Sequence, residues 1–413
     1  MQSARSARPT GTRRSRTRGI IVLGLLSTFG PISLDLYLPA LPQLADDLQA
    51  SASSSQLSIT ACLLGLAAGQ LVAGPLSDRL GRRRPLIVGL LLYLLTSAAC
   101  AFAPTIGVLL VLRLLQGLSG AAGLVISRAV ARDLYSGSEL VVFFSRLMLV
   151  SGLAPVLAPV LGGQLTRVMD WRGIFLVLAG FGVVLLLAGS FGLTETLPPE
   201  RRTTAAGLSA TLRGFRPMLR DRFFVGAALS SGFASASMFA YIAGATFVLQ
   251  RIYGLSAQEF SFVFGMNSIG IMAMSQLGGR LAARRSPAAV LALGLVANLA
   301  GALSLAVTVL TGLPLPFLIC SLLVMVSAVG LIFPTATALA LSDYPQAAGS
   351  ASSLLGLGQY VVGALAAPLV GVAGQQTAVP LGLVALAASL TASAVFVTLV
   401  LPVVRSRRRA RTG

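Results

Sequence analysis

The stretch GPLSDRLGRRRPL, residues 74–86, separates two long apolar runs and holds one aspartate and four arginines in thirteen residues. A shorter stretch of similar pattern, GGRLAARRSP from Gly278, separates another pair of apolar runs. Aligning Arg79 with Arg280 places the two copies 201 residues apart, close to half of the 413-residue chain, and the second copy lacks the aspartate. A loop that recurs at half the chain length predicts two similar halves.

The composition is that of a protein with many membrane spans. The chain is 55% hydrophobic and only 10% charged, whereas soluble domains carry about 25% charged residues. All 31 basic residues are arginine, and the chain contains no histidine. Without lysine it cannot form a Walker A phosphate loop, and without histidine it cannot form a Ser-His-Asp triad or an HExxH zinc site. We therefore expect a protein that is not an enzyme and holds neither a metal nor a cofactor.

The apolar runs predict an all-α membrane protein with twelve transmembrane helices, since about twenty apolar residues span a bilayer. The runs cover residues 19–42, 53–76, 86–103, 106–127, 139–164, 173–194, 223–250, 261–283, 288–311, 316–341, 352–374 and 381–403. The longest polar stretch between runs carries a Pro-Pro pair and divides them into six and six. The expected parts are an arginine-rich tail 1–18, a six-helix bundle 19–194, a linker 195–222, a second six-helix bundle 223–403 and an arginine-rich tail 404–413.

The arginines predict the orientation of these helices. If the N-terminus is cytoplasmic, 26 arginines lie on the inner side and only Arg167, Arg172 and Arg251 on the outer side. Cytoplasmic loops carry an excess of arginine and lysine, so both termini are expected in the cytoplasm. The same rule explains the net charge of +19 better than nucleic-acid binding does, because the arginines cluster at the edges of apolar runs.

The loop at residues 74–86 resembles the loop motif between helices two and three of the major facilitator superfamily. Gly74 and Gly81 would permit a close helix approach and a tight turn. Asp78 would pair with an arginine across the bundle or cap a neighbouring helix end, and that contact would break when the transporter changes its facing. The resemblance gives a role in conformational gating to Gly74, Asp78, Arg79, Gly81, Arg82 and Arg83.

Two further motifs resemble the same superfamily. RLLQGLSGAAG from Arg113 resembles the fourth-helix motif through Arg113, Gln116 and Gly117. GLAPVLAPVLGGQL resembles the fifth-helix motif of exporters, although Ala158 replaces its central glycine. Small residues let helices approach closely and proline bends a span. The residues that carry this exporter motif are Gly152, Pro155, Pro159, Gly162 and Gly163.

Five short fragments narrow the resemblance to the bicyclomycin/chloramphenicol-resistance (Bcr/CflA) subfamily of drug:proton antiporters. They are DLYLPALP from Asp35, RAVARDLY from Arg128, TETLPPERR from Thr194, FVLQRIYGLS from Phe247 and AAGSASSLLGLGQ from Ala347. Their order and spacing extend the resemblance over about residues 19–375. It implies a substrate cavity between the two bundles, with Tyr37, Met148, Met238, Tyr241, Asn267 and Gln359 as candidate lining residues.

Asp35 is the one acidic residue that we place deep inside a span. A carboxylate in hydrocarbon costs several kcal/mol, so it is a functional candidate by default. At 1.5 Å per residue, Asp35 lies roughly 9 Å and Arg113 roughly 10 Å from the outer end, so the two could pair. Two alternatives stay open. Asp35 could be a structural carboxylate, and the Arg113 side chain could extend to the outer membrane surface without pairing with Asp35. We assign both residues to proton coupling.

The expected function is export of an amphipathic drug, chloramphenicol- or bicyclomycin-like, in exchange for protons. The partners would be the drug, protons and the lipid bilayer of the cytoplasmic membrane, with no nucleic acid, and the protein would be a monomer. Two alternatives remain: an exporter of an endogenous metabolite or self-made antibiotic on the same fold, and a membrane sensor that has lost transport.

Overall fold

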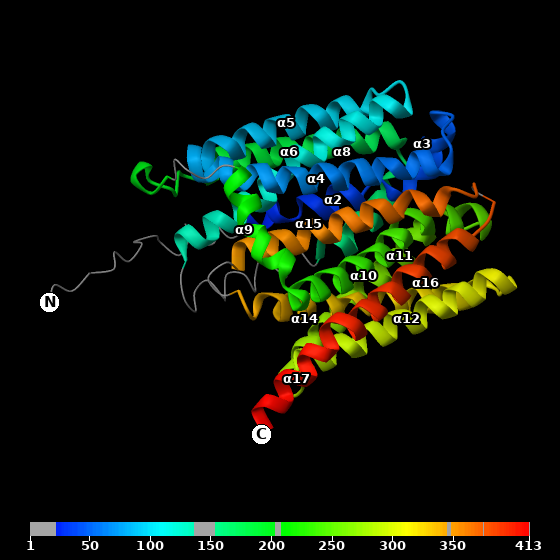
Figure 1. Ribbon diagram of the computed structural model, residues 1–413. Coiled ribbons are helices and arrows are strands. Elements are labelled where there is room, and N and C mark those ends of the chain that lie inside the picture. Colours follow the sequence, from blue (N-terminus) through cyan, green and yellow to red (C-terminus); the bar gives the residue numbers. More distant parts are fainter. Residues whose placement is uncertain (1–21, 136–152, 203–207, 345–347, 375, 413) are drawn as a thin grey trace.

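The computed structural model describes residues 22–135, 153–202, 208–344, 348–374 and 376–412 (Figure 1). Within these ranges the chain is helical and contains no strand. In chain order the elements are α2 (Phe29–Asp35), η1 (Leu38–Ala40), α3 (Leu41–Asp47), α4 (Ala52–Leu80), α5 (Arg83–Ala101), α6 (Ile106–Leu134), the helix Leu153–Leu165, α8 (Trp171–Gly192), η2 (Pro199–Arg201), α9 (Leu208–Arg220), α10 (Arg222–Phe247), η3 (Val248–Ile252), α11 (Ala257–Ala282), α12 (Pro287–Thr311), α13 (Leu315–Ser327), α14 (Val329–Leu341), α15 (Ala348–Ala366), η5 (Ala367–Gly371), α16 (Val379–Val395), η6 (Phe396–Val400) and α17 (Leu401–Thr412).

Ten helices in the described ranges are long and apolar enough to cross a membrane, compared with the twelve that the sequence predicts. The two differences fall at the expected spans 19–42 and 139–164. The first is broken near Pro39 and Pro42 into α2, η1 and α3, because proline cannot donate the backbone hydrogen bond that continues a helix. The second is described only from Leu153, where a helix of thirteen residues ends at Leu165.

Polar side chains fix where several long helices begin. In each case the side chain accepts a hydrogen bond from a backbone N–H of the first turn, a group that has no partner within the helix. The capping residues are Ser51, Thr105, Asp170, Ser256 and Ser286. They anchor the apolar helices at the polar boundaries that the sequence pattern indicates.

The helices pack in two groups that follow the order of the chain (Figure 1). In the first group α4 packs on α6, and α5 packs on both α6 and α8. In the second group α10 packs on α14, α15 and α16, and α12 packs on α13 and α16. The packing of α15 against α4 joins the two groups. The α4–α5 loop, α9 and α17 lie toward one end of the molecule, which we call the basic end, and α3 lies at the opposite, far end.

Glycines bring α4 and α6 into backbone contact. A Cβ atom on Gly65 would lie 2.1 Å from the carbonyl oxygen of Leu114, and a Cβ atom on Gly69 would lie 2.4 Å from that of Leu118. From the other side, a Cβ atom on Gly117 would lie 2.1 Å from the carbonyl oxygen of Cys62. In hydrocarbon, where the hydrophobic effect does not drive helices together, such close packing supplies the attraction.

Gly65→Leu is expected to destabilise the protein, because the new side chain meets backbone that cannot rotate away. Overpacking of this kind costs about 1–3 kcal/mol or more. The matched control is Gly180→Leu on α8, where nothing lies within 4 Å of the added Cβ. The measurement is the apparent melting temperature of detergent-solubilised protein by fluorescence-detected size exclusion. Equal melting temperatures for the two variants would contradict this account of the α4–α6 contact.

Candidate functional site

Arg82 is the centre of the charged network at the α4–α5 loop. Its Nη1 donates to Asp78 Oδ1 at 2.5 Å and to Ser77 Oγ at 2.8 Å, and its Nε donates to Asp133 Oδ2 on α6 at 2.9 Å. Asp78 was expected to pair with an arginine across the bundle, but its partner here is Arg82 of the same motif. Asp133 ties the loop to α6, a link that the sequence analysis did not predict.

Glu195, just after α8, holds the backbone of the same loop. Its carboxylate accepts the N–H groups of Arg82 at 2.8 Å, Arg83 at 3.2 Å and Leu197 at 3.0 Å. Gly81 has φ +89°, and a Cβ atom there would lie 2.5 Å from Glu195 Oε2, so only glycine fits. Partial burial raises the pKa of Glu195, but the three backbone donors and Arg202 outweigh it and lower the pKa below its ordinary value.

Arg113 is fully buried within the first helix group, and neutral groups solvate its charge. Its Nη1 donates to the carbonyl of Ser33 at 3.1 Å and also to the side chain of Gln116. The guanidinium lies 4.5 Å from the ring centroid of Tyr37 and 5.6 Å from that of Phe175. Such cation–π contacts are strong where water is excluded. Nη2 has no hydrogen-bond partner among the described residues.

Asp35 lies at the last residue of α2 and is 6% exposed. Among the described residues its carboxylate makes no ion pair, so the pairing with Arg113 considered from the sequence is not formed in this structure. Three residues further on, η1 packs against α11 and against α10, the helix that carries Tyr241. Tyr241 in turn accepts a hydrogen bond from Asn267 of α11 at 2.9 Å. Asp35 therefore lies where the two helix groups meet.

The exporter motif also lies at this junction. A Cβ atom on Gly162 would lie 2.0 Å from the carbonyl oxygen of Leu36, one residue beyond Asp35. The next residue, Gly163, faces the second group, where a Cβ atom would lie 2.2 Å from Ser261 Oγ of α11. The carbonyl of Pro155 accepts a hydrogen bond from Ser268 at 3.1 Å. Pro159 lies on the same helix, and Gly152 lies outside the described residues.

Contacts between the two groups close the far end. Gln250 Nε2 donates to the carbonyl of Pro39 at 3.2 Å, and Arg251 pairs with Asp46 of α3. Gln56 Nε2 donates to the carbonyl of Ala243 at 3.2 Å. These contacts link η1, α3 and α4 of the first group to α10 and η3 of the second.

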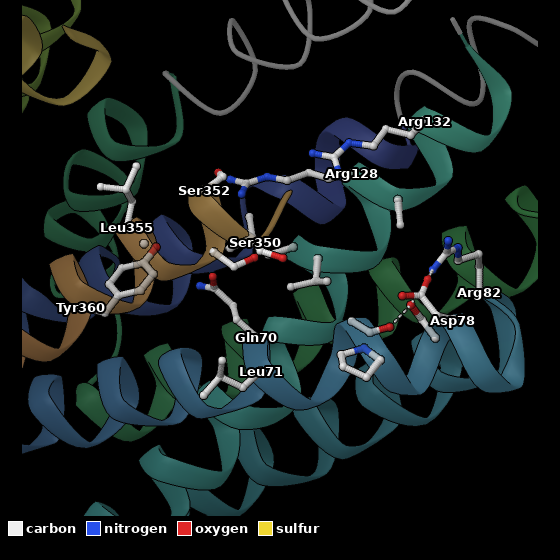
Figure 2. Close-up of a pocket in the computed structure, with 18 of the residues that line it drawn as sticks. Gln70, Leu71, Asp78, Arg82, Arg128, Arg132, Ser350, Ser352, Leu355 and Tyr360 are labelled. Atoms are coloured by element: carbon white, nitrogen blue, oxygen red, sulfur yellow. Dashed lines mark hydrogen bonds and ion pairs between the residues drawn. The ribbon is translucent and has the colours of Figure 1, made fainter. Parts of the chain in front are cut away.

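Toward the basic end a cavity of about 560 Å³ lies between the two groups (Figure 2). Its walls come from α4 and α6 on one side and from α14 and α15 on the other. They include Gln70, Arg128, Ser350, Gln359 and Tyr360. The cavity continues to the loop network, since Asp78 and Arg82 also line it.

Of the residues predicted to line a substrate cavity, Gln359 lines this one. Tyr37, Tyr241 and Asn267 do not, and each is almost fully buried. Met238 is packed against the buried core and is also absent from the cavity wall. Met148 lies outside the described residues.

Sequence reasoning missed three residues of the site. Asp133 and Glu195 each lie in a fragment that carried the family resemblance, as does Arg128. Each of these fragments places a charged residue near the end of a predicted span, and this feature of the sequence could have indicated the three residues. Their partners lie far away in sequence, for example 113 residues between Arg82 and Glu195, so the pattern alone could not pair them.

The chain matches the family model of the Major Facilitator Superfamily over residues 23–368. It is 40% identical to an uncharacterized MFS-type transporter, YdgK, of Bacillus subtilis, over 94% of this chain and 96% of that protein. It is 31% identical to a bicyclomycin resistance protein homolog of Haemophilus influenzae, over 88% of this chain and 91% of the relative. A chloramphenicol resistance protein of Pseudomonas aeruginosa is 32% identical over 72% of this chain and 70% of its own length.

Solved structures agree on the fold. The xylose transporter XylE of E. coli, in a partially occluded inward-open conformation, superposes with a TM-score of 0.71 at 13% identity. The match covers 93% of this chain and 97% of XylE.

The chain is thus a transporter, a multi-pass protein of the cytoplasmic membrane. It belongs to the major facilitator superfamily, and its relatives confirm the resemblance to the drug:proton antiporter branch named for bicyclomycin and chloramphenicol resistance.

Glu195→Ala is expected to loosen the α4–α5 loop, because Arg82 and Arg83 lose the acceptor of their backbone N–H groups. Hydrogen exchange of peptides covering residues 81–85 measures this, with Glu200→Ala in the same linker as the control. The lowered pKa means that the carboxylate stabilises the loop above the ordinary glutamate pKa of about 4.3. That contribution is lost as the pH falls through the lower pKa of the folded protein. Protection that is unchanged by the Glu195 substitution would contradict the role.

Proposed function

We propose that the protein exports amphipathic drugs of the chloramphenicol or bicyclomycin type in exchange for protons, by alternating access. The names of two relatives that match most of the chain support the substrate class. The absence of lysine supports a gradient rather than ATP as the energy source, because a P-loop needs that residue. One charge that crosses 100 mV releases about 2.3 kcal/mol.

The proposed architecture is twelve transmembrane helices in two six-helix bundles, with both termini in the cytoplasm and the protein as a monomer. The domain boundaries are those given by the sequence: tail 1–18, bundles 19–194 and 223–403, linker 195–222 and tail 404–413. The gathering of α9, α17 and the α4–α5 loop at one end supports the orientation, because these segments are rich in arginine. The cavity at the basic end then opens toward the cytoplasm.

The observation that carries the proposal is the buried carboxylate of Asp35 at the junction of the two helix groups. It lacks an ion-pair partner among the described residues, so protonation would remove an uncompensated charge from an apolar site. Its surroundings include groups from both halves, so its exposure would change when the halves move. A proton could then bind on one side of the membrane and leave on the other. The positive charge of Arg113, whose Nη2 has no hydrogen-bond partner among the described residues, would influence proton binding by Asp35.

In the proposed gating, the far end is closed while the basic end is open, and the basic end is closed while the far end is open. Separation of the far end would require the Arg251–Asp46 pair and the Gln250–Pro39 contact to break. Closure of the basic end would bring α15 onto α4 and α6 over the cavity. The loop residues Gly74, Asp78, Arg79, Gly81, Arg82 and Arg83 would hold one conformational state, and the contact of Asp78 would break when the facing changes.

The test of the proposed function uses purified protein in liposomes with a trapped pH-sensitive dye. Addition of chloramphenicol to wild-type protein is expected to cause proton movement that a protonophore abolishes. Drug accumulation that persists after the proton gradient has collapsed would argue against antiport.

Asp35→Asn is expected to fold and insert but to lose drug-induced proton movement, because the amide cannot exchange a proton. Exchange of drug down its own gradient would continue. The matched control is Asp343→Asn, which removes an acid that pairs with Arg407 on the surface at the basic end. If the Asp35 variant still moves protons against drug at the wild-type ratio, Asp35 is not the coupling site.

A further inference from the structure

The charges that line the cavity do not balance. The wall contains two aspartates, Asp78 and Asp133, and three arginines, Arg82, Arg128 and Arg132. Arg82 contacts both aspartates, at 2.5 Å and 2.9 Å. The other two arginines make no ion pair among the described residues. The cavity therefore has an excess of positive charge, and its aspartates are already engaged.

Arg128 is the arginine that points at the opposite wall. It lies on α6 of the first helix group, and its guanidinium is directed toward Ser350 and Ser352 on α15 of the second (Figure 2). Gln70 of α4 and Tyr360 of α15 line the same cavity (Figure 2). These side chains offer hydrogen-bond donors around the guanidinium, and none of the four can carry a negative charge at neutral pH.

We propose that this cavity binds the anionic group of its substrate between Arg128 and the hydroxyl groups of Ser350 and Ser352. The preferred substrate is then an amphipathic organic anion, such as a drug with a carboxylate. This inference rests on the proposed transport function and narrows its substrate class.

The rest of the wall fits the remainder of such a molecule. Apolar side chains line the same cavity and offer a surface for an aromatic or aliphatic body: Leu71, Pro75, Leu124, Val125 and Leu355. Guanidinium groups bind carboxylates through two parallel hydrogen bonds, which makes the contact directional as well as electrostatic. A permanently cationic drug would meet Arg128 and Arg132 with no free carboxylate in the wall to offset the repulsion.

The placement also links binding to movement. The anion would contact α6 of one helix group and α15 of the other, so it would favour the arrangement in which the two walls lie closest together. A ligand shifts a conformational equilibrium only through a difference in affinity between the states. A contact that spans the two groups provides that difference.

The test compares two related compounds, neutral chloramphenicol and its monoanionic succinate ester. Binding to detergent-solubilised wild-type protein is measured by calorimetry, so that it does not depend on transport. Arg128→Gln is expected to raise the Kd of the succinate ester by about tenfold, and to change the Kd of chloramphenicol much less. Arg128→Lys keeps the positive charge but cannot form the two parallel hydrogen bonds of a guanidinium. Its Kd for the succinate ester is therefore expected to lie between those of wild-type protein and Arg128→Gln. The control is Arg284→Gln, which removes an exposed arginine outside the cavity wall and should leave both Kd values unchanged.

A second measurement separates a substrate site from a lipid headgroup site, because both would use the same cationic chemistry. Transport of both compounds is compared in liposomes of phosphatidylcholine and in liposomes that also contain phosphatidylglycerol. A selective defect of Arg128→Gln toward the succinate ester in phosphatidylcholine alone supports the substrate site. A defect that appears only with phosphatidylglycerol overturns it in favour of a lipid site.

The outcomes also distinguish this inference from the proposed function. If wild-type protein exports chloramphenicol with proton movement but Arg128→Gln affects both compounds equally, the anion site is wrong and the drug exporter stands. If neither compound is exported, the proposed function is wrong for this drug class. Calorimetry then decides the anion site by itself: selective loss of succinate-ester binding supports it, and no binding by wild-type protein overturns it.

Discussion

A charged side chain inside a membrane protein must find its partners within the protein, and Arg113 shows how this chain meets that constraint. No acidic side chain among the described residues pairs with it. Backbone carbonyls of α2 and α4, the amide of Gln116 and two aromatic faces surround its guanidinium instead. The glycine contacts between α4 and α6 bring these groups within reach, because they place the backbone of α4 directly against α6. The close packing of α4 on α6 therefore both holds the first helix group together and places the groups that solvate the charge of Arg113.

The charged network at the α4–α5 loop, at the basic end, likewise depends on a few side chains. Arg82 links two aspartates from different helices, and Glu195 holds the backbone of the turn that carries Arg82. The α4–α5 loop, the end of α6 and the end of α8 are thus connected through a few side chains. The shorter loop from Gly278 lacks the aspartate, so the two halves are not equivalent in this respect.

The two ends of the molecule differ in a way that suits a transporter. At the far end, hydrogen bonds and an ion pair join the two helix groups, whereas toward the basic end a cavity lies between them. The buried polar groups of Asp35, Tyr241 and Asn267 lie where the groups meet, and the exporter-motif glycines pack beside them. Gly162 faces one group and Gly163 faces the other, so two adjacent residues of one helix contact both sides of the junction.

The sequence by itself determined the membrane character, most of the spans and the charged residues that are candidates for the site. Apolar runs of fixed length and arginines at their edges are local properties, so composition and spacing are enough to find them. The loop motif, Arg113 and Asp35 were found this way. The tertiary structure alone decided the partners. It gave Arg113 neutral partners rather than Asp35, connected Arg82 to Asp133 and Glu195, and set Arg128 opposite Ser350 and Ser352. These contacts join residues tens to hundreds of positions apart, and their geometry depends on helix rotation and tilt, which close packing between helices fixes and local sequence does not.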